Sequence, residues 1–179
     1  MGGAGLAERC ASLVRDVPDW PTPGVTFKDI TPLLADGPML REVVEHLAAR
    51  ARALGEIDLV AGMEARGFIL GAPVATALGA GFIPVRKAGK LPGPTLDATY
   101  ALEYASAAIE VRPDTIDRGA RILVLDDVLA TGGTAAATAA LLERAGGQVV
   151  GLSFLVELTF LAGRARLEGR HVEALFGVD

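Results

Sequence analysis

Residues 122–134 read Ile-Leu-Val-Leu-Asp-Asp-Val-Leu-Ala-Thr-Gly-Gly-Thr. The four aliphatic residues at 122–125 are typical of a strand that is buried on both faces of a parallel sheet. Two carboxylates, Asp126 and Asp127, come next, and a loop of small residues then leads into a predicted helix over 134–144. In open α/β sheets, ligands bind beyond the carboxyl ends of the strands. We therefore expect a binding site at the end of this strand.

The loop after the two carboxylates has the composition of a phosphate-binding loop. Small residues let backbone N–H groups approach a phosphate closely, and the N-terminus of the following helix adds partial positive charge. The loop is not a Walker A motif, because no Gly-Lys-Ser/Thr follows, and it lacks the Gly-x-Gly-x-x-Gly of dinucleotide-binding folds. Carboxylates before such a loop suit a ribose, whose vicinal hydroxyls would donate to Asp126 and Asp127. The 5′-phosphate would then lie in the loop formed by Ala130, Thr131, Gly132, Gly133 and Thr134. The competing interpretation is a plain turn, with a threonine as helix cap and two solvated aspartates.

Strand and helix patterns alternate along the rest of the chain. Helical spacing of apolar residues predicts helices, and short apolar runs predict strands. This alternation is typical of a single α/β domain with a parallel sheet and helices on both faces. Helices are predicted over 6–14, 38–54 and 67–78, and strands over 57–62, 82–86, 100–104, 108–111 and 149–156. The proline-rich segment 18–24 predicts an extended connector, and residues 87–99, which have no apolar period, predict a long functional loop.

Composition narrows the possible functions. The chain has 179 residues, of which 51% are hydrophobic, and a mean hydropathy of +0.39, which excludes a disordered chain. No apolar run approaches the roughly 20 residues of a membrane-spanning helix, and no secretory signal is apparent. A single cysteine, Cys10, cannot form an internal disulfide, which favours a reducing cytoplasm.

The charge balance restricts the class of ligand. Seventeen basic and 22 acidic residues give a net charge of −5 and a pI of about 5.1, which argues against a nucleic-acid partner. An anionic substrate must therefore be held by a local group of cations. Arg86, Lys87 and Lys90 form the one dense basic cluster, and Arg66 follows the end of a predicted strand.

The stretch at 122–134 resembles the phosphoribosyl pyrophosphate motif of the type I phosphoribosyltransferases. Further segments, in the same order along nearly the whole chain, narrow the resemblance to the adenine phosphoribosyltransferases. These segments are Phe-Lys-Asp-Ile-Thr-Pro at 27–32, Ala-Arg-Gly-Phe at 65–68, Val-Arg-Lys-Ala-Gly-Lys-Leu-Pro-Gly-Pro-Thr at 85–95, Leu-Glu-Tyr at 102–104 and Leu-Val-Glu-Leu-Thr at 155–159. This chain has Glu64-Ala65 where the family usually has Asp-Ser, and Ala105 where it usually has Gly.

The resemblance implies a fold, a reaction and a set of partners. The fold is the type I phosphoribosyltransferase fold, with a small base-binding hood at 1–35 and a mobile lid at 87–104. The reaction converts adenine and phosphoribosyl pyrophosphate into AMP and pyrophosphate, with Mg²⁺ bound mainly through substrate oxygens and also by Asp126 and Asp127. It also implies a homodimer.

The same resemblance assigns roles to individual residues. Glu103 would exchange a proton with the purine, Tyr104 would pack over the reacting centre, and Arg66 would contact the pyrophosphate during the reaction. A 6-oxopurine enzyme carries an acidic residue at the position of Ala130, so Ala130 favours adenine. The other pyrophosphate contacts would be Arg86, Lys87 and Lys90, and adenine would contact Val25, Thr26, Phe27, Lys28 and Leu158. The alternatives are a transferase for another base, such as xanthine or orotate, and a non-catalytic nucleotide sensor that keeps the fold.

Overall fold

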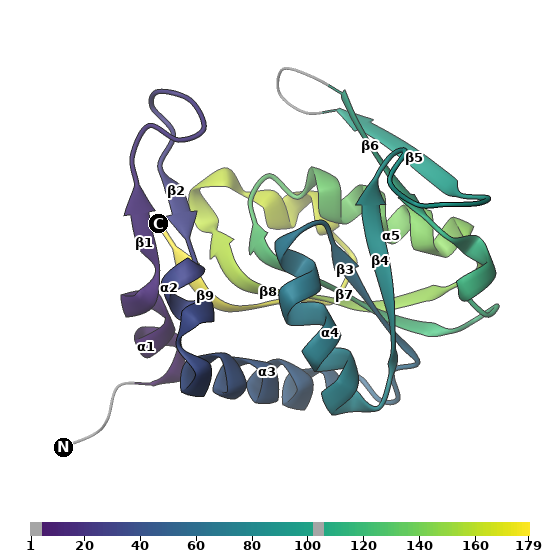
Figure 1. Ribbon diagram of the computed structural model, residues 1–179, viewed down its shortest axis with the longest axis horizontal. Helices are drawn as coiled ribbons and strands as arrows, with labels where there is room; N and C mark the ends of the chain where they lie inside the picture. The colour runs from purple at the N-terminus through teal and green to yellow at the C-terminus, as the bar shows by residue number, and fades with distance from the viewer. Residues whose placement is uncertain (1–4, 102–105) are drawn as a thin grey trace. The chain divides into compact units, whose positions relative to one another are not determined.

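The computed structural model describes residues 5–101 and 106–179 (Figure 1). The chain forms two compact units, residues 1–46 and residues 47–179, and the boundary lies within one helix. The sequence pattern predicts one domain, and the family resemblance implies a hood at 1–35, within the range of the first unit.

The first unit combines short helices with a two-stranded antiparallel sheet. The helix predicted over 6–14 is confirmed as α1, and the proline-rich connector at 18–24 contains neither helix nor strand. In the sheet, Val17 lies opposite Phe27. The elements are α1 (Leu6–Leu13), β1 (Arg15–Val17), β2 (Phe27–Asp29), α2 (Thr31–Ala35) and the start of α3 (Gly37–Arg52), which continues into the second unit.

The second unit is built on a mostly parallel sheet. Within the described residues its strand order is β5-β6-β4-β3-β7-β8-β9. The strands from β4 to β9 in this order run parallel to one another, whereas β6 pairs antiparallel with both β4 and β5. The strands are β3 (Leu59–Met63), β4 (Gly81–Lys87), β5 (Leu96–Ala101), β6 (Ser106–Val111), β7 (Arg121–Leu129), β8 (Gln148–Leu158) and β9 (Val172–Val178).

Helices cover the sheet of the second unit. In Figure 1, α4 (Arg66–Leu78) crosses the near side of β3 and β7, and α5 (Gly133–Arg144) lies behind β4. Three short 3₁₀ helices complete the unit: η1 (Pro113–Thr115), η2 (Thr159–Leu161) and η3 (Gly163–Leu167). Helices on both faces of a mostly parallel sheet are the predicted architecture. No helix in the described part of the chain is long and apolar enough to cross a membrane.

The central strand, β7, is longer than its aliphatic run. Residues 122–125 are at most 2% exposed, as expected for a strand between two layers of helix. The sequence pattern ends the strand at 125, but pairing with β8 continues to Leu129, which lies opposite Glu157. Asp126 and Asp127 therefore lie on the strand, where the sheet fixes their backbone, and not in the loop that follows.

The segment predicted as a loop over 87–99 contains part of a strand. Residues 96–101 form β5, which pairs with β6 across Thr99 and Ala108. Leu96, Ala98 and Tyr100 alternate toward the core, the period of a half-buried strand, but the preceding glycines and prolines mask this pattern. The expected lid at 87–104 thus includes a turn and a strand, and residues 102–105 lie outside the described part of the chain.

Candidate active site

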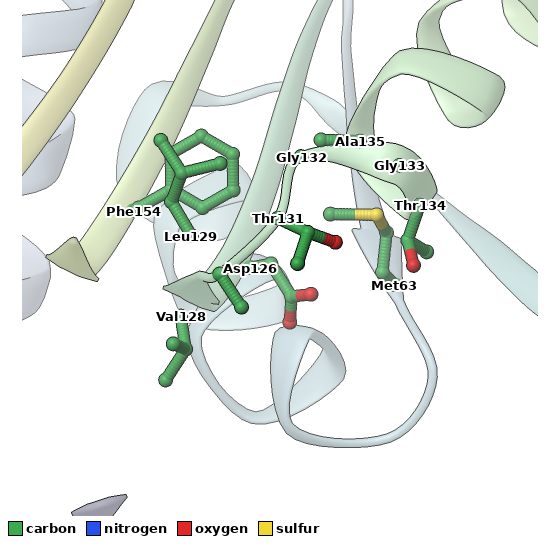
Figure 2. Close-up of a pocket in the computed structure, with 11 residues that line it drawn as sticks. Met63, Asp126, Val128, Leu129, Thr131, Gly132, Gly133, Thr134, Ala135 and Phe154 are labelled. Carbon is green, nitrogen blue, oxygen red and sulfur yellow. The ribbon is translucent and has the colours of Figure 1, made fainter. Parts of the chain in front are cut away.

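The candidate phosphate-binding loop connects the end of β7 to the start of α5. Residues 130–132 form the loop, and Gly132, with φ +78°, precedes the first residue of the helix. No side chain caps α5, so the competing interpretation of a threonine-capped turn is wrong. The loop lines a small cavity of about 80 Å³ together with the end of β7, and in Figure 2 the Asp126 carboxylate and the hydroxyls of Thr131 and Thr134 lie around it. A cavity of this size suits one phosphate group, at a helix end whose N–H groups favour anions.

The loop is held from behind by a segment that the sequence does not single out. A Cβ atom built on Gly163, at the start of η3, would lie 2.0 Å from the Ala130 carbonyl oxygen and 2.9 Å from the Gly132 nitrogen. Only a glycine lets the two backbones approach this closely. The sequence gives no signal for this role, because the contact joins residues more than thirty positions apart.

Tyr100 is a second contact to the loop that sequence reasoning missed. The Thr134 hydroxyl donates a hydrogen bond to the Tyr100 hydroxyl at 3.0 Å. This bond ties the start of α5 to β5, the strand next to the undescribed residues 102–105. The Thr134 hydroxyl thus has a partner within the protein.

The two carboxylates of β7 differ in their surroundings. The Asp127 side chain is 4% exposed, and its Oδ2 forms an ion pair with Nε of Arg66. Among the described residues, no group donates a hydrogen bond of good geometry to this oxygen, which is almost completely buried. The Asp127 N–H donates to Oδ1 of Asp126 at 2.9 Å. Loss of hydration, and then the neighbouring Asp127 charge, raise the pKa of Asp126 well above its ordinary value.

Arg66 lies at the start of α4, where a cation opposes the helix dipole. The sequence alone suggests an anionic ligand as its counter-ion, and in the structure its guanidinium pairs with Asp127. A Cβ on the next residue, Gly67, would lie 2.8 Å from the Leu125 carbonyl oxygen. Gly67 therefore lets the helix start approach β7 closely enough for this ion pair.

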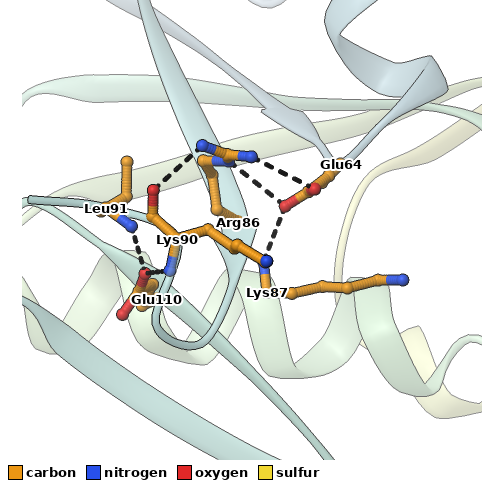
Figure 3. Close-up of polar contacts among 6 residues, drawn as sticks. All are labelled: Glu64, Arg86, Lys87, Lys90, Leu91 and Glu110. Carbon is orange, nitrogen blue, oxygen red and sulfur yellow. Dashed lines mark hydrogen bonds and ion pairs between the residues drawn. The ribbon is translucent and has the colours of Figure 1, made fainter.

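The basic cluster lies at the end of β4 and in the turn after it (Figure 3). The Arg86 guanidinium donates to both carboxylate oxygens of Glu64 at 3.3 Å and to the Lys90 carbonyl at 3.0 Å. Glu64 also accepts the Lys87 N–H at 3.0 Å, and that bond, followed by Arg86, lowers the pKa of Glu64. No ion pair involves the ammonium groups of Lys87 and Lys90 within residues 5–101 and 106–179.

The remaining expected site residues fall into three groups. Glu103 and Tyr104 lie outside the described residues. Leu158 is half-buried at the end of β8 in the second unit. The other four belong to the first unit: Val25 and Thr26 are exposed, and Phe27 and Lys28 are half-buried. The Lys28 ammonium forms an ion pair with Asp16 at 2.7 Å.

The described residues provide few metal ligands. They contain no group of three or more His, Cys, Asp or Glu side chains that could hold a metal ion. Asp126 and Asp127 are the carboxylates beside the candidate phosphate-binding loop. They fit an ion that takes most of its oxygen ligands from the substrate, as Mg²⁺ usually does.

Comparison with known proteins agrees with this geometry. Residues 33–171 match the family model of the phosphoribosyl transferase domain. The chain is 57% identical to the adenine phosphoribosyltransferase of Streptomyces coelicolor over 178 residues, covering 97% of each chain. It is 55% identical to that of Frankia casuarinae over 173 residues, covering 97% of this chain and 92% of the relative.

Solved structures give the same result. The crystal structure of adenine phosphoribosyltransferase from Thermoanaerobacter pseudethanolicus superposes with a TM-score of 0.92 at 46% identity, covering 96% of this chain and 99% of that one. That of Saccharomyces cerevisiae, solved with adenine and an imino-altritol bisphosphate, gives 0.89 at 37% identity, covering 95% and 98%. The chain therefore belongs to the adenine phosphoribosyltransferase family, within the phosphoribosyl transferase domain family.

Proposed function

We propose that this chain transfers the 5-phosphoribosyl group of phosphoribosyl pyrophosphate to adenine, giving AMP and pyrophosphate. The observation that carries the proposal is the arrangement at the carboxyl end of β7. There an acidic pair, a cavity-lining loop at a helix start and the guanidinium of Arg66 lie next to one another. These are the groups that a phosphorylated ribose with a pyrophosphate leaving group requires.

Each part of the sugar donor has a partner in this scheme. The hydroxyl groups of the ribose donate to Asp126 and Asp127, and the 5′-phosphate accepts from the N–H groups of the loop at 130–134. Arg66, Arg86, Lys87 and Lys90 bind the pyrophosphate, and the bonds to Glu64 and to the Lys90 carbonyl hold the Arg86 guanidinium in place. The bond from C1′ to the pyrophosphate oxygen breaks, the bond from C1′ to N9 of adenine forms, and the N9 proton leaves.

A divalent cation belongs to the proposal. Mg²⁺ bound to the sugar donor would neutralise negative charge on the departing pyrophosphate. Asp126 and Asp127 are the described side chains that would help to hold it. Their oxygen ligands suit a hard cation.

The remaining assignments rest on the family resemblance. Glu103 exchanges the purine proton, and Tyr104 packs over the reacting centre. Phe27 stacks on the adenine ring with Val25, Thr26 and Lys28 around it, and Leu158 closes the other face. We also propose a homodimer, and a cytoplasmic location that the single Cys10 supports.

An assay with a panel of bases tests the choice of substrate. Pyrophosphate release is measured from phosphoribosyl pyrophosphate and Mg²⁺ with adenine, hypoxanthine, guanine, xanthine or orotate. We expect turnover with adenine and kcat/KM values lower by at least about 10²-fold with the other bases, since a site built to hydrogen-bond one substrate rejects others strongly. Faster turnover of another base, or no turnover with any of them, would contradict the proposal.

A further inference from the structure

Glu110 is a buried carboxylate that none of the roles above uses. It lies on β6, and the residue is 4% exposed. Among the described residues no cation forms an ion pair with it. Burying a charge without a counter-ion is costly unless hydrogen bonds replace its water. The bonds that Glu110 makes should therefore have a purpose in the fold or in the site.

Most of the hydrogen bonds that Glu110 accepts come from the backbone of the turn after β4, and the Thr95 side chain also donates to it. Its Oε1 accepts the N–H of Lys90 at 2.7 Å and the N–H of Leu91 at 2.6 Å (Figure 3). These N–H groups lower the pKa of Glu110, the Leu91 bond most of all, so the carboxylate is charged at neutral pH. Bonds from amides to a charged carboxylate are stronger than neutral ones.

The same turn is held from its other side by Arg86. Arg86 lies directly opposite Glu110 in the antiparallel pair of β4 and β6. Its guanidinium donates to the Lys90 carbonyl at 3.0 Å, and Glu64 fixes the guanidinium in turn. Both polar groups of the Lys90 backbone are thus fixed by charged side chains, the N–H by Glu110 and the carbonyl by Arg86.

We propose that Glu110 is a positioning residue for pyrophosphate binding. By fixing the turn at 88–91, it sets where the ammonium groups of Lys87 and Lys90 are presented, without touching the substrate itself. This inference rests on the proposed function, in which those two lysines bind the pyrophosphate. The buried negative charge also offsets the repulsion among three cations, Arg86, Lys87 and Lys90, gathered within five residues.

The test compares two ligands that use different parts of the site. Pyrophosphate with Mg²⁺ depends on the turn, whereas AMP depends on the loop at 130–134. Calorimetry with Glu110→Ala should show pyrophosphate affinity weakened by about 10-fold or more, because small displacements of binding groups are costly. AMP affinity should stay within about twofold. Glu110→Gln should bind pyrophosphate better than Glu110→Ala, because its remaining oxygen can accept both N–H bonds.

Asp58 provides a matched control for the loss of a carboxylate bound to a backbone amide. Its Oδ2 accepts the Arg121 N–H at 2.7 Å, at the opposite ends of β3 and β7 from the site. Asp58→Ala should lower thermal stability while leaving both affinities unchanged. Equal losses of pyrophosphate and AMP affinity in Glu110→Ala would indicate a purely structural role and overturn the inference.

A lysine variant separates the inference from the proposed function. If Lys90→Ala binds pyrophosphate as well as the wild type does, the proposed role of the turn is wrong. If Lys90→Ala weakens binding but Glu110→Ala does not, only the role of Glu110 is overturned. Should Glu110→Ala fail to fold, Glu110→Leu, which keeps the bulk of the side chain but accepts no N–H bond, decides the question, and wild-type pyrophosphate affinity in that variant would refute the positioning role.

Discussion

Replacing Gly163 by alanine tests how the candidate phosphate-binding loop is supported. The added Cβ would lie 2.0 Å from the Ala130 carbonyl oxygen, whereas ordinary contact begins at 3.4 Å. The two segments must therefore separate by up to 1.4 Å, the difference between those values. The obstacle is backbone and not the end of a flexible side chain, so the loop or η3 has to move as a whole.

We expect Gly163→Ala to weaken mainly the binding of phosphoribosyl pyrophosphate. A misplacement of about 1 Å in a binding group can reduce activity about 10²-fold, so kcat/KM for phosphoribosyl pyrophosphate should fall by that order. Overpacking costs about 1–3 kcal/mol of stability, which leaves the variant folded if the wild type has ordinary stability. Initial rates at varied sugar-donor concentration, with AMP affinity from calorimetry, measure the first effect, and thermal unfolding measures the second.

Gly37→Ala is the control for this substitution. A Cβ on Gly37 meets nothing within 4 Å, and the residue begins α3. It should leave both kcat/KM and AMP affinity unchanged. Wild-type AMP affinity in Gly163→Ala would refute the reasoning, as would a loss of activity no greater than the fraction of unfolded protein.

Four further outcomes are expected. Glu103→Leu should lower kcat by about 10²–10⁴-fold, since it removes the proposed proton acceptor, and unchanged turnover in a steady-state assay would remove that role. Asp127→Asn should chiefly weaken sugar-donor binding, because it removes both a ribose acceptor and the counter-ion of Arg66, and donor affinity measured by calorimetry checks this. Because the pKa of Glu110 is below its ordinary value of 4.5 in the folded chain, the stability that its ionisation provides is fully present above pH 4.5 and lost as the pH falls through the lowered pKa. The difference in urea-unfolding free energy between the wild type and Glu110→Ala should accordingly be constant from about pH 7 to 5 and shrink on further acidification. Finally, chelation of divalent cations should abolish sugar-donor binding measured by calorimetry, and addition of Mg²⁺ should restore it. Tight binding in excess chelator would argue against a role for the metal.

The sequence predicts the central layer well because that layer is decided by local patterns. Four consecutive aliphatic residues identify β7, and the small-residue loop marks the start of α5. The edge strands have no such signal. In β9 (Val172–Val178) most residues are only half-buried, and the strand forms because β8 offers it a parallel partner. That pairing is a tertiary contact, which no local window contains.

In the candidate site too, local sequence patterns predict some features, and tertiary contacts decide the others. Asp126 and Asp127 lie near the candidate phosphate-binding loop because they precede it directly in sequence. Ligands of parallel sheets bind at the carboxyl ends of the strands, so the place of the site could also be predicted. The ion pair of Arg66 with Asp127 joins two different strand ends and needs the sheet order. The roles of Glu110 and Gly163 depend on single contacts between distant segments, and neither residue type carries a chemical signal of its own.

The balance of charges around the described site favours binding of a polyanion together with a counter-ion. Four carboxylates and four cations gather there: Glu64, Glu110, Asp126 and Asp127, with Arg66, Arg86, Lys87 and Lys90. Both arginines are already paired with carboxylates, so their charges are partly neutralised before any ligand arrives. The pairing holds each guanidinium in place and so reduces the conformational entropy lost on binding, but it leaves little net positive charge. A pyrophosphate group that enters such a site is therefore expected to bring a cation with it, in agreement with the proposed Mg²⁺.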